Sequence, residues 1–102
     1  MAQINTKRKG TRFETKVKQE LESKGYLCMR QSASRFPDIV AIRDGVAFVV
    51  ECKTNKYLSK DEKLKGTEIF NQYCDFLIAY PVKEGRCVVI EYMNLNNEKI
   101  KI

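Results

Sequence analysis

The chain has 102 residues, 43% of them hydrophobic and 31% charged, a composition typical of one globular domain rather than of a disordered chain. Nineteen Lys and Arg residues outnumber thirteen Asp and Glu residues, which gives a net charge of +6 and favours an anionic partner, nucleic acid first. A solvated surface and an anionic membrane are the alternatives. The absence of histidine excludes Ser-His-Asp and Cys-His nucleophiles, a histidine general base and His-ligated zinc.

The positive charge is concentrated at the start of the chain. Residues 1–36 carry nine basic and three acidic side chains, so they hold the whole excess. Residues 1–9 are polar and basic without apolar periodicity, which predicts a flexible basic arm ahead of a single domain at residues 10–102. Within that domain a first helix is expected over residues 10–23, because Phe13, Val17 and Leu21 recur every four residues.

Two apolar runs in the middle of the chain predict a β-hairpin. A short strand is expected over residues 26–31, followed by a loop over 32–37. Residues 38–42 and 46–53 are then joined by Asp44-Gly45, and Asp-Gly between β-branched runs is a strong signal for a two-residue turn. Both runs are apolar at successive positions, so we expect central strands that are covered on both faces.

The second half of the chain predicts another helix and further strands. Ser59 and Glu62 form an S-x-x-E capping box that opens a helix ending near Tyr73. Strands are expected over 75–82 and 87–93, with a possible edge strand over 99–102. The predicted fold class is α/β, a central mixed sheet flanked by helices in the order α-β-β-β-α-β-β. The apolar residues expected on the inner face of the second helix are Leu64, Ile69, Phe70 and Tyr73.

The four cysteines and the apolar runs indicate the cellular compartment of the protein. The cysteines lie at positions 28, 52, 74 and 87 and form no C-x-x-C pair, which argues against a zinc ribbon or a thioredoxin-like site. We expect reduced thiols in an intracellular, cytoplasmic protein of cellular, viral or phage origin, because the chain shows no signal peptide. A secreted scaffold with two disulfides is the alternative. The apolar runs are too short to cross a membrane.

The predicted hairpin register places two carboxylates opposite each other. With Asp44-Gly45 as the turn, Asp38 faces Glu51, and Lys53 points to the same face two residues further on. Two like charges that face each other destabilise a sheet unless something neutralises them. A divalent cation such as Mg²⁺ or Mn²⁺ suits two carboxylates on adjacent strands. The alternative is that both are solvated or paired with Lys53.

The same residues resemble a known nuclease signature. Pro37-Asp38 followed by Glu51-Cys52-Lys53 after a hairpin resembles the motif of the PD-(D/E)XK nuclease superfamily, which implies a restriction-endonuclease-like core. Over residues 7–56 the chain also resembles the archaeal-type Holliday junction resolvases. The segments that carry this second resemblance are Lys7-Arg8-Lys9-Gly10 with Glu14, Lys24-Gly25-Tyr26 before a strand ending at Arg30, Ala33-Ser34, Pro37-Asp38-Ile39-Val40-Ala41 and Asp44-Gly45-Val46.

The resemblance implies a catalytic set and a metal. It implies Mg²⁺, with Mn²⁺ as a substitute, held by Asp38, Glu51 and the Cys52 carbonyl with help from Glu14. From the residues alone, Glu14 is also compatible with an ordinary helix carboxylate, and Ser34 with a turn residue for which Ser32 competes. Relatives often carry arginine directly after the helix glutamate, where this chain has Thr15. The implied catalytic residues are Glu14, Ser34, Asp38, Glu51 and Lys53.

The function expected from the resemblance is resolution of four-way DNA junctions by paired, symmetric phosphodiester hydrolysis. The enzyme would act as a homodimer on branched double-stranded DNA, without a nucleotide cofactor or a membrane. Apolar parts of the second helix or the last strands would form the dimer surface. The alternatives are a flap, nicking or restriction-like nuclease of the superfamily, or a catalytically silent DNA-binding module. The expected DNA contacts are Lys7, Arg8, Lys9, Gly10, Arg12, Arg30 and Arg35, with Lys56 and Lys60 as weaker candidates.

Overall fold

The computed structural model describes residues 2–31 and 36–102, with side chains from residue 12 onward in these ranges. Neither helix in this part of the chain combines the length and apolar character that a membrane crossing requires. The elements are α1 (Ala2–Ser23), β1 (Leu27–Arg30), β2 (Ile39–Arg43), β3 (Val46–Cys52), α2 (Lys60–Gln72), β4 (Asp75–Glu84), β5 (Cys87–Met93) and β6 (Lys99–Ile100).

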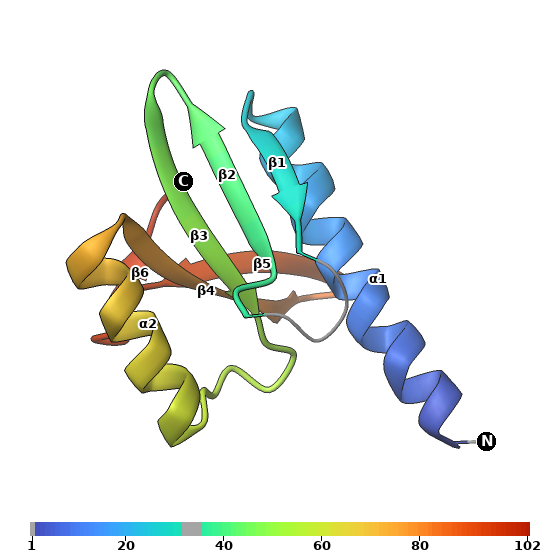
Figure 1. Ribbon diagram of the computed structural model, residues 1–102. Coiled ribbons are helices and arrows are strands. Elements are labelled where there is room, and N and C mark those ends of the chain that lie inside the picture. Colours follow the sequence, from blue (N-terminus) through green and yellow to red (C-terminus); the bar gives the residue numbers. More distant parts are fainter. Residues whose placement is uncertain (1, 32–35) are drawn as a thin grey trace.

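The strands form one six-stranded mixed sheet in the order β1-β2-β3-β4-β5-β6 (Figure 1). β3 and β4 run parallel, and the other neighbouring strands in the sheet are antiparallel. A parallel pair needs a long crossover connection, and α2 supplies it between β3 and β4. The predicted α/β class and element order are therefore confirmed, with β6 as a two-residue edge strand.

The two helices cover opposite faces of the sheet. Phe13, Val17 and Leu21 of α1 pack with Val50 in one apolar cluster. Val49, the neighbour of Val50 in β3, belongs to a second cluster against which Ile69 of α2 packs. Successive residues of a strand point to opposite faces, so this alternation separates the two layers. β3 is buried on both faces as predicted, whereas the second face of β2 is only half-buried.

The hairpin has the predicted register. Arg43 pairs with Val46, Ala41 with Phe48 and Ile39 with Val50. Asp44 and Gly45 both have positive φ angles, 53° and 78°, which is the conformation of a type I′ turn. This tight turn leaves no freedom to slip the register, so the residues at the far end of the hairpin are brought together by a local signal.

The first helix begins at Ala2 rather than near residue 10, so residues 2–9, predicted as a flexible basic arm, are helical. Their Ala, Gln, Lys and Arg residues are good helix formers, and helix formation does not need an apolar stripe. These first turns project beyond the sheet (Figure 1). The helix ends at Ser23, as expected from the stop at Gly25. The φ of Gly25 is 91°, and hydrogen bonds run from Gly25 N to Glu22 O and from Tyr26 N to Leu21 O.

The second helix begins with the predicted capping box at Ser59, and Ile69 packs inward as expected, but the other three residues predicted for the inner face do not. Leu64, Phe70 and Tyr73 are 62%, 55% and 79% exposed. Gly66 is the buried residue of this helix, and a Cβ added to it would lie 3.0 Å from Cε1 of Phe76. The missing side chain therefore allows α2 to lie close to the sheet.

Replacing Gly66 by alanine should destabilise the protein although alanine is the better helix former. Phe76 is 1% exposed and stacks on Phe36 with a centroid distance of 5.3 Å, so its ring has little room to move. Overpacking costs about 1–3 kcal/mol and exceeds the helix-propensity gain of about 1 kcal/mol, so the free energy of unfolding should fall by roughly 1 kcal/mol. Urea denaturation of Gly66→Ala measures this.

The matched control for this prediction is Lys65→Ala, one position away on the exposed side of the same helix. It should leave stability nearly unchanged. A Gly66→Ala protein that is more stable than the wild type would show that α2 can move away from the sheet at no cost.

Candidate active site

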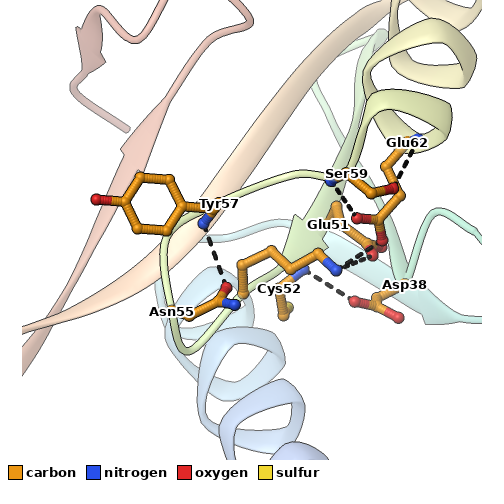
Figure 2. A network of polar contacts seen from close by, with 8 residues as sticks. Asp38, Glu51, Cys52, Asn55, Tyr57, Ser59 and Glu62 are labelled. Atoms are coloured by element: carbon orange, nitrogen blue, oxygen red, sulfur yellow. Dashed lines mark hydrogen bonds and ion pairs between the residues drawn. The ribbon is translucent and has the colours of Figure 1, made fainter.

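The end of the central hairpin brings two carboxylates together. Asp38 directly precedes β2, and Glu51 is the second-last residue of β3. Asp38 Oδ2 accepts a hydrogen bond of 2.8 Å from the backbone N–H of Cys52, which fixes the Asp38 side chain against the end of β3 (Figure 2). The Asp38 and Glu51 side chains are close enough to interact. The structure therefore brings together the two residues that the register predicted to face each other.

Glu51 is in an unfavourable environment for a charged group. Its side chain is 9% exposed, and it is the buried charged residue in the part of the chain that the structure describes. Its Oε1 atom has no hydrogen-bond partner among the described residues. Burial, followed by the carboxylate of Asp38, raises the pKa of Glu51 to about 9. Both effects favour the protonated form of Glu51 in the metal-free protein.

Lys53 contacts two carboxylates on the same face. Its Nζ lies 3.9 Å from Glu51 Oε2 and 2.6 Å from Glu62 Oε2. Glu62 also accepts a 2.8 Å hydrogen bond from Ser59 N through Oε1, as the capping box requires (Figure 2). Burial opposes ionisation of Glu62, but the hydrogen bonds from Lys53 and Ser59 outweigh it and lower its pKa.

Glu62 is the site residue that the sequence did not reveal. The capping-box pattern identified Glu62 as an N-terminal residue of the second helix, but not the direction in which its second oxygen points. That direction depends on how α2 sits on the sheet.

Glu14 reaches the carboxylates from the other layer. Its Oε2 lies 2.7 Å from Arg30 Nη2, and Arg30 Nη1 is 3.4 Å from Thr15 Oγ1. Burial and the charge of Asp38 raise the pKa of Glu14, although Arg30 acts in the opposite direction. Arg30 on β1 thus places a guanidinium beside the helix glutamate and next to Thr15.

Some of the remaining expected site residues are described by the structure and others are not. Arg12 and Lys60 are exposed, and Lys56 Nζ lies 4.9 Å from the ring centroid of Tyr80. Gly10 lies within α1. Ser32, Ser34 and Arg35 lie outside the described residues, as do the side chains of Lys7, Arg8 and Lys9.

The donor atoms at this site fit a hard divalent cation. Among the described residues, no group of three or more His, Cys, Asp or Glu side chains is arranged to hold a metal ion. Mg²⁺, however, is commonly bound through one or two carboxylates with water completing the shell. Asp38 and Glu51 provide two carboxylates, and the buried Oε1 of Glu51 has no hydrogen-bond partner among the described residues. A cation here would satisfy that atom and remove the repulsion between the carboxylates.

The raised pKa of Glu51 predicts how stability depends on pH in the metal-free protein. The folded pKa, about 9, lies above the ordinary value of 4.5, so between these values the folded state binds one more proton than the unfolded state. Stability should then fall as pH rises through this window, by up to about 1.4 kcal/mol per pH unit. Glu51→Gln removes this titration, so its stability should fall less. Urea denaturation in EDTA from pH 5 to about 9 measures both slopes.

The control for this measurement is Glu68→Gln, an exposed residue of α2, which should keep the wild-type slope. Equal slopes for wild type and Glu51→Gln would contradict the prediction and indicate that Glu51 is already ionised in the free protein.

Comparison with known proteins identifies the family. The family model for the archaeal Holliday junction resolvase (Hjc) matches residues 5–76. The crossover junction endodeoxyribonuclease Hjc of Methanocaldococcus jannaschii is 39% identical over 70 residues, which cover 62% of this chain and 53% of that protein's length. The structure of Hjc from Archaeoglobus fulgidus, a Holliday junction resolvase, superposes with a TM-score of 0.68 at 28% identity and covers 86% of this chain and 74% of its own. The chain therefore belongs to the archaeal Holliday junction resolvase family.

Proposed function

We propose that the protein is a metal-dependent endonuclease that resolves four-way DNA junctions by symmetric phosphodiester hydrolysis. The observation that carries this proposal is the buried Glu51, which faces Asp38 and has Lys53 alongside. A buried pair of carboxylates with a neighbouring lysine costs stability and suits phosphoryl chemistry. Membership of the resolvase family supports a branched substrate. The chain spans about half the length of its M. jannaschii relative, so the substrate belongs to this proposal.

Four groups of the chain would hold the metal. Asp38, Glu51 and the Cys52 carbonyl would bind Mg²⁺ or Mn²⁺, and Glu14 would assist through a second ion or a water. When bound, such a cation acidifies a water and stabilises negative charge on a phosphoryl oxygen. The hydrogen bond from Cys52 N to Asp38 Oδ2 keeps the Asp38 carboxylate oriented for this task.

Lys53 and Ser34 would act on the scissile phosphate. The Lys53 ammonium lies beside Glu51, where it can orient the attacking water or stabilise the charge that develops on the phosphate. Ser34 would contact the phosphate from its loop, with Ser32 as the alternative hydroxyl. No histidine is needed in this arrangement, because carboxylates, a lysine and a hard cation supply the chemistry.

The basic residues of α1 and the loop after β3 would contact the DNA backbone. Arg12 is exposed on α1, the helix that also carries Lys7, Arg8, Lys9 and Gly10. Backbone contacts by such residues give salt-dependent affinity that is independent of sequence. Arg35, Lys56 and Lys60 remain candidate contacts. Arg30 is already paired with Glu14, so we propose that it orients the carboxylate and adds only indirectly to DNA binding.

A homodimer would match the symmetry of a junction. A four-way junction offers two equivalent strands for cleavage, and a two-fold dimer places one active site at each. The exposed apolar side chains of α2, together with Val88 on β5, are the candidate interface. Exposed apolar groups of this size are frequently found at interfaces between subunits.

A comparison of substrates tests the proposed function. With Mg²⁺, the wild-type protein should make paired, symmetric nicks in a four-way junction and leave a flap and a plain duplex uncut. Asp38→Asn should lose cleavage by at least about 10²-fold, because removal of a ligand charge weakens both metal binding and transition-state stabilisation. Its junction affinity in a gel-shift assay without metal should stay near that of the wild type.

Three other results would argue for a different function. Equal cleavage of the duplex would contradict junction specificity, and cleavage of the flap alone would favour another nuclease of the superfamily. Junction binding without cleavage of any substrate would favour a silent binding module. Normal cleavage by Asp38→Asn would show that the catalytic centre lies elsewhere.

The proposed dimer surface is tested by sedimentation equilibrium. Replacing Phe70 and Tyr73 together by serine should weaken dimerisation by at least about tenfold. A tenfold change corresponds to roughly 1.4 kcal/mol, and burial of one aromatic side chain can contribute more free energy than that. The control is Tyr57→Ser, at an aromatic residue on the loop before α2 that is about as exposed as Tyr73. An unchanged dimer in the double variant would place the interface elsewhere, with Val88 on β5 as the next candidate.

A further inference from the structure

The lysine of the nuclease motif is held by an acidic residue from outside the motif. Lys53 Nζ lies 2.6 Å from Glu62 Oε2, much closer than the 3.9 Å that separates it from Glu51 Oε2. We propose that Glu62 is a positioning residue that fixes the ammonium of Lys53 beside the carboxylate pair and so sets where it meets the scissile phosphate. This inference rests on the function proposed above and extends it.

A lysine at this position needs a partner to be held in one place. Its four-carbon side chain has many rotamers, and restricting them costs up to about 2 kcal/mol of conformational entropy. The Lys53 and Glu62 side chains are only 24% and 23% exposed. Their ion pair is therefore screened less by solvent than a fully exposed one and can restrain the ammonium more strongly.

Glu62 is itself held in place by the capping box. Its Oε1 accepts the Ser59 N–H at 2.8 Å, and the Glu62 N–H donates to Ser59 Oγ at 3.2 Å. The other oxygen is thereby directed at Lys53. One turn further along α2, Gly66 lets the helix approach the sheet, which keeps Glu62 within reach of the end of β3. A side chain supported in this way can place a second side chain accurately.

Glu62 also provides a negative charge for Lys53 that would remain when Asp38 and Glu51 bind a metal ion. In the proposed mechanism Asp38 and Glu51 would bind a divalent cation, so their charge would no longer be free to hold Lys53. Glu62 lies on a different element and stays available for the ammonium. The chain thus separates the carboxylates that bind metal from the carboxylate that holds the lysine.

The substitution Glu62→Gln isolates this role. Glutamine at this position still caps the helix through its amide oxygen, but it has lost the charged second oxygen that faces Lys53. Single-turnover cleavage of a four-way junction should slow by about 10–100-fold, since small errors in the placement of a catalytic group cost that much. Junction affinity and the midpoint of thermal unfolding should stay close to wild type. The matched control is Asp61→Asn, which removes the same charge from the same helical turn at an exposed position and should cleave normally.

A second measurement needs neither metal nor activity. In ¹⁵N NMR spectra of the lysine ammonium groups, Lys53 in the metal-free wild type should give a signal protected from exchange with water, assigned by its absence in Lys53→Arg. Glu62→Gln should lose that protection, and Asp61→Asn should retain it. Loss of protection together with slower cleavage and unchanged affinity would support the positioning role.

Several outcomes would overturn the proposal. Glu62→Gln that cleaves at the wild-type rate, or faster, would show that the ion pair is dispensable or restrains Lys53 in an unproductive position. Lys53 protection that persists in Glu62→Gln would show that another group holds the ammonium. If the wild-type protein cleaves none of the substrates, the proposed function fails and this inference fails with it. If the wild type cleaves the junction and Glu62→Gln cleaves it at the same rate, only the positioning role is overturned and the proposed function stands.

Discussion

The placement of Asp38 and Glu51 at the end of the central hairpin is the constraint on which the rest of the site depends. Two carboxylates face each other where apolar strands end, and one of them is nearly buried, with a pKa raised to about 9. Such an arrangement lowers the free energy of unfolding unless a proton, a basic side chain or a metal ion neutralises the negative charge. Positively charged side chains lie on both sides of this pair. Lys53 is near Glu51, and Arg30 is paired with Glu14.

The surrounding elements give each of these groups a separate support. Arg30 on β1 holds Glu14 of α1, and Glu62 of α2 holds Lys53 at the end of β3. The two helices lie on opposite faces of the sheet, yet each contributes a carboxylate at the same end of the hairpin. The side chains of a site assembled from both layers keep defined positions only if the helices are fixed relative to the sheet. The close packing of Gly66 against Phe76 provides this on one face.

Local signals in the sequence were sufficient for much of the fold. The Asp44-Gly45 turn, the S-x-x-E capping box and the Gly25 helix stop all appear where they were predicted, because each depends on the conformation of a few consecutive residues. The apolar stripe of α1 was also predicted correctly. The start of that helix was not, because polar residues with high helix propensity need no buried face to become helical. The inner face of α2 was predicted correctly only at Ile69, since Leu64, Phe70 and Tyr73 are exposed.

The sequence by itself determined that Asp38, Glu51 and Lys53 share one face, because a two-residue turn sets hairpin register through short-range geometry. It also determined that the excess positive charge lies ahead of these residues. Only the tertiary structure decided that Arg30 pairs with Glu14 and that Glu62 reaches Lys53. Those contacts depend on the rotation of each helix about its axis and on its distance from the sheet. Shape complementarity between residues far apart in the chain sets both, and periodicity alone does not encode it.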